Sequence, residues 1–137
     1  MGMDLLFDVY AGRHLSTCFN NLRNIMFTDH ELLKLAALAA GLEPDKAEWT
    51  QRAGLVWIQR VDGIRKEFRW NPLTDDGEAL RLAVRLNMTI AVGIARSDAG
   101  EFTEFNLWET DKCLAIRRAI VRAAAEIGRQ MLEIGTK

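Results

Sequence analysis

The densest group of residues that could do chemistry is a set of three carboxylates, Asp75, Asp76 and Glu78, which follows the sequence WNP at 70–72. Neighbouring carboxylates could hold a divalent cation or act as a general acid and base. The same residues suit the start of a helix, where side-chain oxygens accept hydrogen bonds from free amides and negative charge favours the helix dipole. No histidine lies near them in the sequence. We therefore favour helix capping, and we expect no metal and no cofactor.

Gly77 lies in the first turn of this predicted helix, where a glycine costs up to about 1 kcal/mol relative to alanine. Close packing of another backbone segment explains it, and so does the approach of a ligand to the helix N-terminus. If a ligand or a partner binds here, we expect it to contact Trp70, Asn71, Asp75 and Asp76.

A second group of candidate residues is basic and lies in the last predicted helix. Arg118 and Arg122 are one turn apart and, together with Arg129, could reach the phosphates of a nucleic acid. Glu126 follows Arg122 by one turn, however, which is the spacing of an ordinary surface ion pair. The formal net charge of −1 also disfavours a dedicated nucleic-acid binder. The four tryptophans could stack on bases, but tryptophan more commonly fills a core or covers a sheet.

No catalytic constellation is visible, and we assign no catalytic residue. His14 and His30 are isolated, and the sequence contains no GxSxG, HExxH, Walker or GxGxxG motif. Cys18 and Cys113 lie far apart without CxxC spacing, which favours two free thiols in a reducing cytoplasm. An enzyme is therefore disfavoured.

Composition is that of an ordinary globular chain. With 137 residues, of which 49% are hydrophobic and 27% charged, one domain with its own core is expected. No apolar run approaches the roughly 20 residues needed to cross a bilayer. The first residues carry Asp4 and Asp8 where a secretory signal would be basic. We expect a cytoplasmic protein with no membrane partner.

Residues 1–25 are the least well specified part of the chain. Leu5, Leu6, Val9 and Tyr10 could form one face of a short helix, but Gly12 and the asparagines at 20–21 interrupt any longer pattern. Two interpretations stay open: an N-terminal extension, or a segment docked on the core or on a neighbouring subunit. The remaining residues, 26–137, form the predicted single domain.

From Phe27 onwards the sequence predicts the helices and strands of this domain. Thr28 and Glu31 have the spacing of a capping box, and Gly41 ends the helix that they open, over 29–40. A polar loop follows over 43–53. Strands over 55–60 and 64–70 then form a hairpin, with Ile64, Phe68 and Trp70 on a face that turns inward.

The second half predicts a similar sequence of elements. A helix over 74–87, with Ala79, Leu80, Ala83 and Leu86 inward, precedes a second hairpin of strands 88–96 and 102–108. The small residues on one side of strand 88–96 suggest that a helix packs closely there. A long helix over 110–133, with arginines on its exposed face, ends the chain. The order α-β-β-α-β-β-α predicts an α+β fold, in which a four-stranded, mainly antiparallel sheet carries helices on both faces as an α-β-α sandwich.

Three runs of sequence resemble, in this order, a family of small phage and prophage proteins, the phage ABA sandwich domain. They are TDHELLKLAALAAGLE, WNPLTDDGEALRLAVRL and AIRRAIVRAAAEIGRQM, within about residues 26–132. The most specific piece is W-x-P-L-x-D-D-G-x-A-L-x-L, intact from Trp70 to Leu82. The resemblance implies an α-β-α sandwich and a phage accessory protein in a bacterial host, and it brings no biochemical activity.

Together these features predict a non-enzymatic protein-interaction module, which binds a protein partner or a second copy of itself. The alternative is a weak nucleic-acid-binding module that uses the basic last helix through Arg118, Arg122 and Arg129. A small enzyme or ligand-binding protein that uses Asp75 and Asp76 is the third and least favoured hypothesis.

Overall fold

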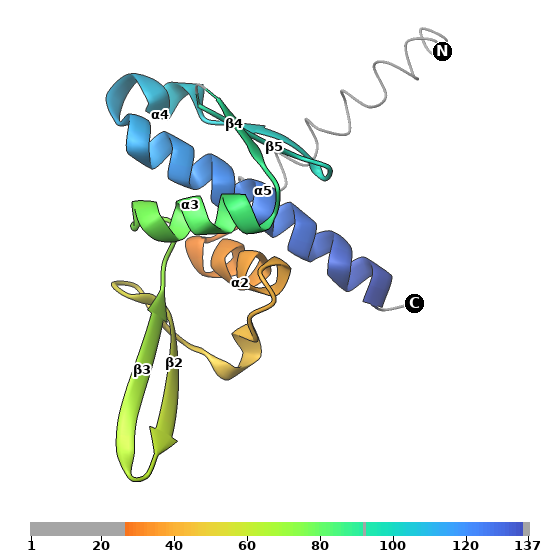
Figure 1. The fold of residues 1–137 in the computed structure, drawn as a ribbon. Helices are drawn as coiled ribbons and strands as arrows, with labels where there is room; N and C mark the ends of the chain where they lie inside the picture. The colour runs from red at the N-terminus through yellow and green to blue at the C-terminus, as the bar shows by residue number, and fades with distance from the viewer. Residues whose placement is uncertain (1–26, 92, 136–137) are drawn as a thin grey trace, which may run out of the picture.

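The computed structural model describes residues 27–91 and 93–135, and the predictions for residues 1–25 lie outside this range. One long helix runs through the middle of the molecule (Figure 1), and helices and strands from the rest of the chain pack around it. This central helix is α5 (Lys112–Gly135), which contacts α2 (Asp29–Ala39), α3 (Asp76–Arg85), α4 (Phe105–Thr110), β5 (Ile94–Ser97) and β6 (Gly100–Thr103).

Close approach of α5 to its neighbours follows from its small side chains. Its buried positions include Ala115, Ala119, Ala123, Ala124 and Ala125. At Gly128 the backbone of α2 comes so near that a Cβ atom would lie 2.0 Å from the carbonyl oxygen of Leu35. Only glycine fits at this position of α5.

The predicted start and end of α2 are both confirmed. The Thr28 hydroxyl accepts a hydrogen bond from the Glu31 amide at 3.2 Å, and the Glu31 carboxylate accepts one from the Thr28 amide at 3.1 Å. At the other end Gly41 has a φ of +82°, and the Leu42 amide donates to the Ala37 carbonyl oxygen at 2.9 Å. This left-handed residue and its bond end the helix, as glycine commonly does.

The first sheet is antiparallel, and half of it projects from the body of the molecule (Figure 1). Its order is β1 (Glu48–Thr50), β2 (Gly54–Val61) and β3 (Ile64–Trp70). The predicted β2–β3 hairpin is confirmed, and Asp62 and Gly63 turn it with φ values of +55° and +78°. β1 adds a strand and pairs only with residues 54–56 of β2.

The prediction that this hairpin turns one face inward is therefore wrong for most of its length. Trp70 is buried at the base of the hairpin, but Ile64 and Phe68, on the same face, are exposed. Beyond the end of β1 the hairpin extends past the core, so nothing within the described part of the chain covers this face.

The second sheet corrects the predicted second hairpin. Residues 88–96 do not form one strand: β4 (Thr89–Ala91) pairs antiparallel with β5 (Ile94–Ser97), and Gly93 turns the chain between them with a φ of +61°. The return strand also ends early, because β6 (Gly100–Thr103) is followed by α4, where residues 102–108 were predicted to stay extended. Ala95 is fully buried beside α5, in agreement with the predicted close helix.

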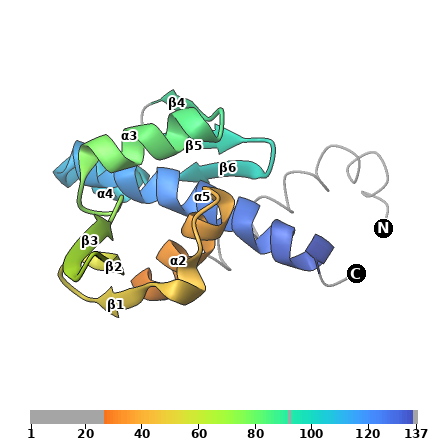
Figure 2. The ribbon, with the colours of Figure 1, turned by 60° about the horizontal axis from the view of Figure 1, so that its bottom comes forward.

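The fold is α+β, but the single four-stranded sheet was a wrong prediction. Two three-stranded antiparallel sheets, β1-β2-β3 and β4-β5-β6, share no ladder. Figure 2 shows them at different sides of the helices, with α3 and α5 between them. The missed reversal is the one between β4 and β5, whose only signal in the sequence is Gly93.

Candidate functional site

The residues 70–78, first among the predicted sites, form a structural turn between β3 and α3. The Asn71 carbonyl oxygen accepts hydrogen bonds from the amides of Thr74 and Asp75 at 3.1 and 3.0 Å, and its side-chain oxygen accepts one from Leu73 at 3.2 Å. Asp75 caps α3, since its carboxylate accepts from the Glu78 amide at 2.9 Å. The predicted capping role is confirmed for Asp75, while Thr74 belongs to the turn before the helix.

Asp76 is tied to the central helix. Its carboxylate lies 2.5 Å from Nη1 of Arg117, whose Nε also donates to the Leu73 carbonyl oxygen at 2.7 Å. One arginine thus connects α5 to the turn and to the first residue of α3. Within the described residues no group of three or more His, Cys, Asp or Glu side chains is placed to hold a metal ion.

At Gly77 a Cβ atom would meet no backbone atom within 4 Å among its three nearest neighbours. Those neighbours are the carboxylate of Asp75 at 3.3 Å and the guanidinium of Arg81 at 3.4 Å. Close backbone packing, one of the two explanations that the sequence left open, therefore does not apply here. It applies instead at Gly128.

Three of the four residues expected to share one site line different hollows of the surface. Trp70 lines a groove of about 520 Å³ between the hairpin and α3. Asn71 lines another, of about 440 Å³, beside the stacked rings of His30 and Trp49, whose centroids are 4.6 Å apart. Asp76 lines a third beside Arg117 and the exposed, free thiol of Cys113.

The arginines of α5 do not form an exposed basic face, and that prediction was wrong. Arg122 is 3% exposed; its Nη1 lies 3.0 Å from the Glu104 carboxylate and 3.1 Å from the Thr103 carbonyl oxygen. Burial lowers the pKa of Arg122, and the charge of Glu104 opposes that shift. Arg118 lies 3.2 Å from Asp29 and 3.7 Å from Glu104.

The end of α5 holds a second charged cluster, which sequence reasoning placed on the surface. Glu126 is fully buried, and its carboxylate accepts hydrogen bonds from Nε of Arg129 at 2.9 Å and from Gln130 at 3.2 Å. Arg129 also pairs with Glu133 at 2.7 Å. Hydrogen bonds to Glu126 raise the pKa of Arg129. All four of these side chains lie on α5 itself and pair along the helix, so α5 offers few free charges to a phosphate backbone.

The exposed apolar residues gather elsewhere, on the hairpin and on α3. Five of them, here called the hairpin–α3 surface, are Val61, Ile64, Phe68, Leu80 and Val84, which are 43%, 61%, 49%, 61% and 68% exposed. Strand register puts the three hairpin residues on one face, because Val61 pairs with Ile64 and Phe68 follows Ile64 by four residues on the same strand. Phe68, Leu80 and Val84 line the groove of about 520 Å³, with Trp70 and Leu82 buried beneath them.

Charged side chains border this groove. Arg81 and Arg85 lie on α3, and Arg81 pairs with Glu78 at 3.1 Å. Lys66 lies on the same strand face as Phe68. An apolar surface with a predominantly basic border is suited to a protein segment that carries apolar side chains and carboxylates.

Sequence reasoning missed this surface, although one signal was present. Leu80 was expected to face inward, but it lies one turn before Val84 on an exposed side of α3, next to the side that carries the buried Ala79 and Ala83. Apolar residues therefore surround more of α3 than one buried face can use. That excess indicates a helix with a second contact.

Comparison with known proteins found no matching family model, no matching curated protein and no matching solved structure. Among the described residues, no helix is long and apolar enough to span a membrane.

Proposed function

We propose that this chain is a non-enzymatic protein-interaction module, and that the hairpin–α3 surface is its binding site. The observation that carries the proposal is the exposure of five large apolar side chains on the hairpin and α3, three of which, Phe68, Leu80 and Val84, line one groove. Keeping such a patch in water is unfavourable, and contiguous patches with a polar border commonly mark protein contacts. The partner segment presents apolar side chains to Phe68, Leu80 and Val84, and carboxylates to Lys66 and Arg85.

We also propose that the protein comes from a phage or a prophage. The run from Trp70 to Leu82, which carries the resemblance to the phage ABA sandwich domain, forms the base of the groove and most of α3. We infer a phage or prophage accessory protein that acts in the cytoplasm of a bacterial host. The two separate sheets depart from the single sheet that the order of elements predicted.

The alternative of nucleic-acid binding through α5 loses its main support. Arg118, Arg122 and Arg129 are each within 4 Å of a carboxylate, and Arg122 is buried. Binding phosphates would require breaking these pairs, and a buried arginine left without its carboxylate is costly.

The test is capture from lysate of a host that carries the parent phage, with and without nuclease. Wild type is compared with the double variant Leu80→Gln and Val84→Gln, which removes apolar surface but keeps good helix-forming residues. The matched control is Met131→Gln with Ile134→Gln, which removes exposed apolar side chains from the far end of α5.

We expect a stoichiometric protein with wild type and with the control, and at least about a tenfold weaker retention by the α3 variant, as for loss of a central apolar contact. Equal retention by all three proteins would place the binding site elsewhere. Capture that disappears with nuclease would replace this proposal by the nucleic-acid hypothesis.

A further inference from the structure

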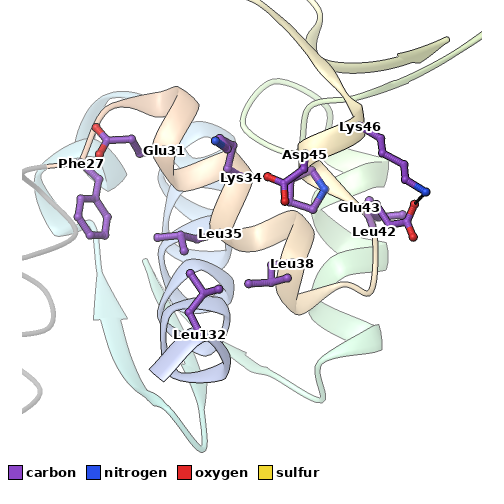
Figure 3. A pocket seen from close by; sticks show the side chains of 11 residues that line it. Phe27, Glu31, Lys34, Leu35, Leu38, Leu42, Glu43, Asp45, Lys46 and Leu132 are labelled. Atoms are coloured by element: carbon purple, nitrogen blue, oxygen red, sulfur yellow. Dashed lines mark ion pairs between the residues drawn. The ribbon is translucent and has the colours of Figure 1, made fainter. Parts of the chain in front are cut away.

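A second apolar groove lies on the outer side of α2, and Leu42 lines both this groove and the one beside the hairpin–α3 surface. It measures about 580 Å³ and runs between α2, the short 3₁₀ helix η1 (Pro44–Lys46) and the end of α5. Its apolar lining consists of Phe27, Leu35, Leu38, Leu42, Pro44 and Leu132. In Figure 3 the side chains of Leu35, Leu38 and Leu132 point toward one another across this hollow.

The lining repeats with the spacing of a helix-packing face. Leu32, Leu33, Ala36 and Ala37 form the inner side of α2 and are fully buried. Leu35 and Leu38, three residues apart, form a second side of α2 that remains partly exposed, and Leu42, just past the end of the helix, continues the apolar lining. A surface of this kind fits the apolar side of another helix.

The segment 15–25, which precedes Phe27 in the sequence, has the pattern of a helix with one apolar side. Leu15, Cys18, Phe19, Leu22 and Ile25 recur at spacings of three and four residues, which on a helix places them within one narrow arc. The polar residues Ser16, Thr17, Asn20, Arg23 and Asn24 fall on the remaining arc. The asparagines at 20–21, which interrupt the pattern when the sequence is read as a longer apolar run, thus lie outside this stripe.

The position and the length of segment 15–25 also match those of the groove. Phe27 lines the groove, so the segment 15–25 is joined to the groove through Met26 alone. At a rise of 1.5 Å per residue, a helix over 15–25 is about 16 Å long, the same length as the 11 residues of α2. An antiparallel return along α2 also brings Arg13 toward Asp45 at the far end of the groove.

We propose that residues 15–25 form an amphipathic helix that folds back antiparallel to α2 and fills this groove within the same molecule. Leu15, Phe19 and Leu22 cover Leu35, Leu38 and Leu132, and Cys18 becomes buried beside them. Joining the occupant to the rim of its groove gives it a high effective concentration, so no second chain is needed. The segment then belongs to the domain rather than extending from it.

The native thiol of Cys18 reports on this contact. In the full-length chain carrying Cys113→Ser, which removes the exposed cysteine, the rate at which a thiol-specific reagent modifies Cys18 is measured. If the helix docks, Cys18 is buried between it and the groove. The reaction should then be at least about tenfold slower than in a variant whose helix is released. Phe19→Asp changes the segment, and Leu38→Asp changes the groove.

The controls separate docking from a loss of folding. Asn20→Asp places the same carboxylate one residue along, on the polar side, and should leave Cys18 slow. Leu132→Asp repeats the groove change at a residue that is 50% exposed, so its fold is retained even if Leu38→Asp unfolds. Each variant is checked for an unchanged circular dichroism spectrum.

A slow Cys18 in wild type and in Asn20→Asp, with fast modification in Phe19→Asp and in Leu132→Asp, supports the proposal. Rapid modification in wild type overturns it. Slow modification that the groove variants do not accelerate also overturns it, because Cys18 is then covered elsewhere. Protection that disappears on dilution, in a protein that light scattering shows to be a dimer, makes a second copy the occupant and overturns the intramolecular fold-back.

Discussion

The last helix and the first hairpin of this protein reverse the roles that their sequences indicate. α5 carries regularly spaced arginines, the usual mark of a binding face, yet Arg117, Arg118 and Arg122 reach other elements of the fold and pair with Asp76, Asp29 and Glu104. The β2–β3 hairpin alternates like a strand pair on a core, yet most of its apolar face meets solvent. Residue type alone therefore does not decide whether a side chain contacts solvent or the rest of the fold. In these two regions the decision depends on whether a neighbouring element extends far enough to cover the side chain.

The largest effect is expected when a buried charge of α5 loses its partner. Arg129→Met leaves the fully buried Glu126 with only the amide of Gln130 among the hydrogen-bond donors described here. We expect a loss of about 3 kcal/mol in the free energy of unfolding, because removing one partner leaves the other charge buried and uncompensated. Urea denaturation measures it. The matched change Arg60→Met on the exposed hairpin should alter stability by less than about 0.5 kcal/mol, and equal losses would remove the contrast between the two regions.

A second contrast compares two helical glycines. Gly128→Ala should destabilise by about 2 kcal/mol, because the new Cβ would press on the Leu35 carbonyl oxygen and push α2 and α5 apart. Gly77→Ala meets only the ends of side chains and should be neutral, or stabilise by up to about 1 kcal/mol through helix propensity. Thermal denaturation of both variants decides this. Destabilisation by Gly77→Ala would mean that the turn before α3 is more tightly packed than the structure shows.

The smallest expected effect is on how the stability of the protein depends on pH at the start of α2. Hydrogen bonds from the amide and hydroxyl of Thr28 hold the pKa of Glu31 below its ordinary value of 4.5. The folded protein therefore releases the Glu31 proton more readily than the unfolded chain. Its stabilisation is present above pH 4.5 and is lost as the pH falls through the lower folded pKa.

Glu31→Gln should remove that part of the acid dependence. The difference in unfolding free energy between wild type and this variant should shrink as the pH is lowered from 6 to 3, as measured by urea denaturation at each pH. A difference that grows toward low pH would contradict the capping-box account. Asp98→Asn, which changes an exposed carboxylate in the turn between β5 and β6, is the control.

The elements fixed by neighbouring residues could be predicted from the sequence. The Thr28–Glu31 capping box, the left-handed stop at Gly41, the Asp75 cap and the Asp62–Gly63 turn each involve residues within five positions of one another. Such local hydrogen bonds and backbone angles leave a clear mark on residue type.

What could not be predicted depends on residues that are distant in the chain. Arg118 pairs with Asp29, 89 positions away, and Arg117 reaches Leu73 across 44 positions. No spacing rule reveals such partners, so these arginines looked exposed. The same holds for the exposed hairpin face, because its solvent contact follows from the shortness of β1, which the sequence presented as a loop.

The most direct test of this contrast is the stability of the variant with Leu80→Gln and Val84→Gln, compared with wild type by urea denaturation. If both side chains are a contact surface that awaits a partner, the free energy of unfolding should stay within about 0.5 kcal/mol of wild type, as for exposed positions. A loss of about 2 kcal/mol or more, the usual cost of truncating buried leucine or valine, would show that they belong to the core. The assignment of binding to the hairpin–α3 surface would then be wrong.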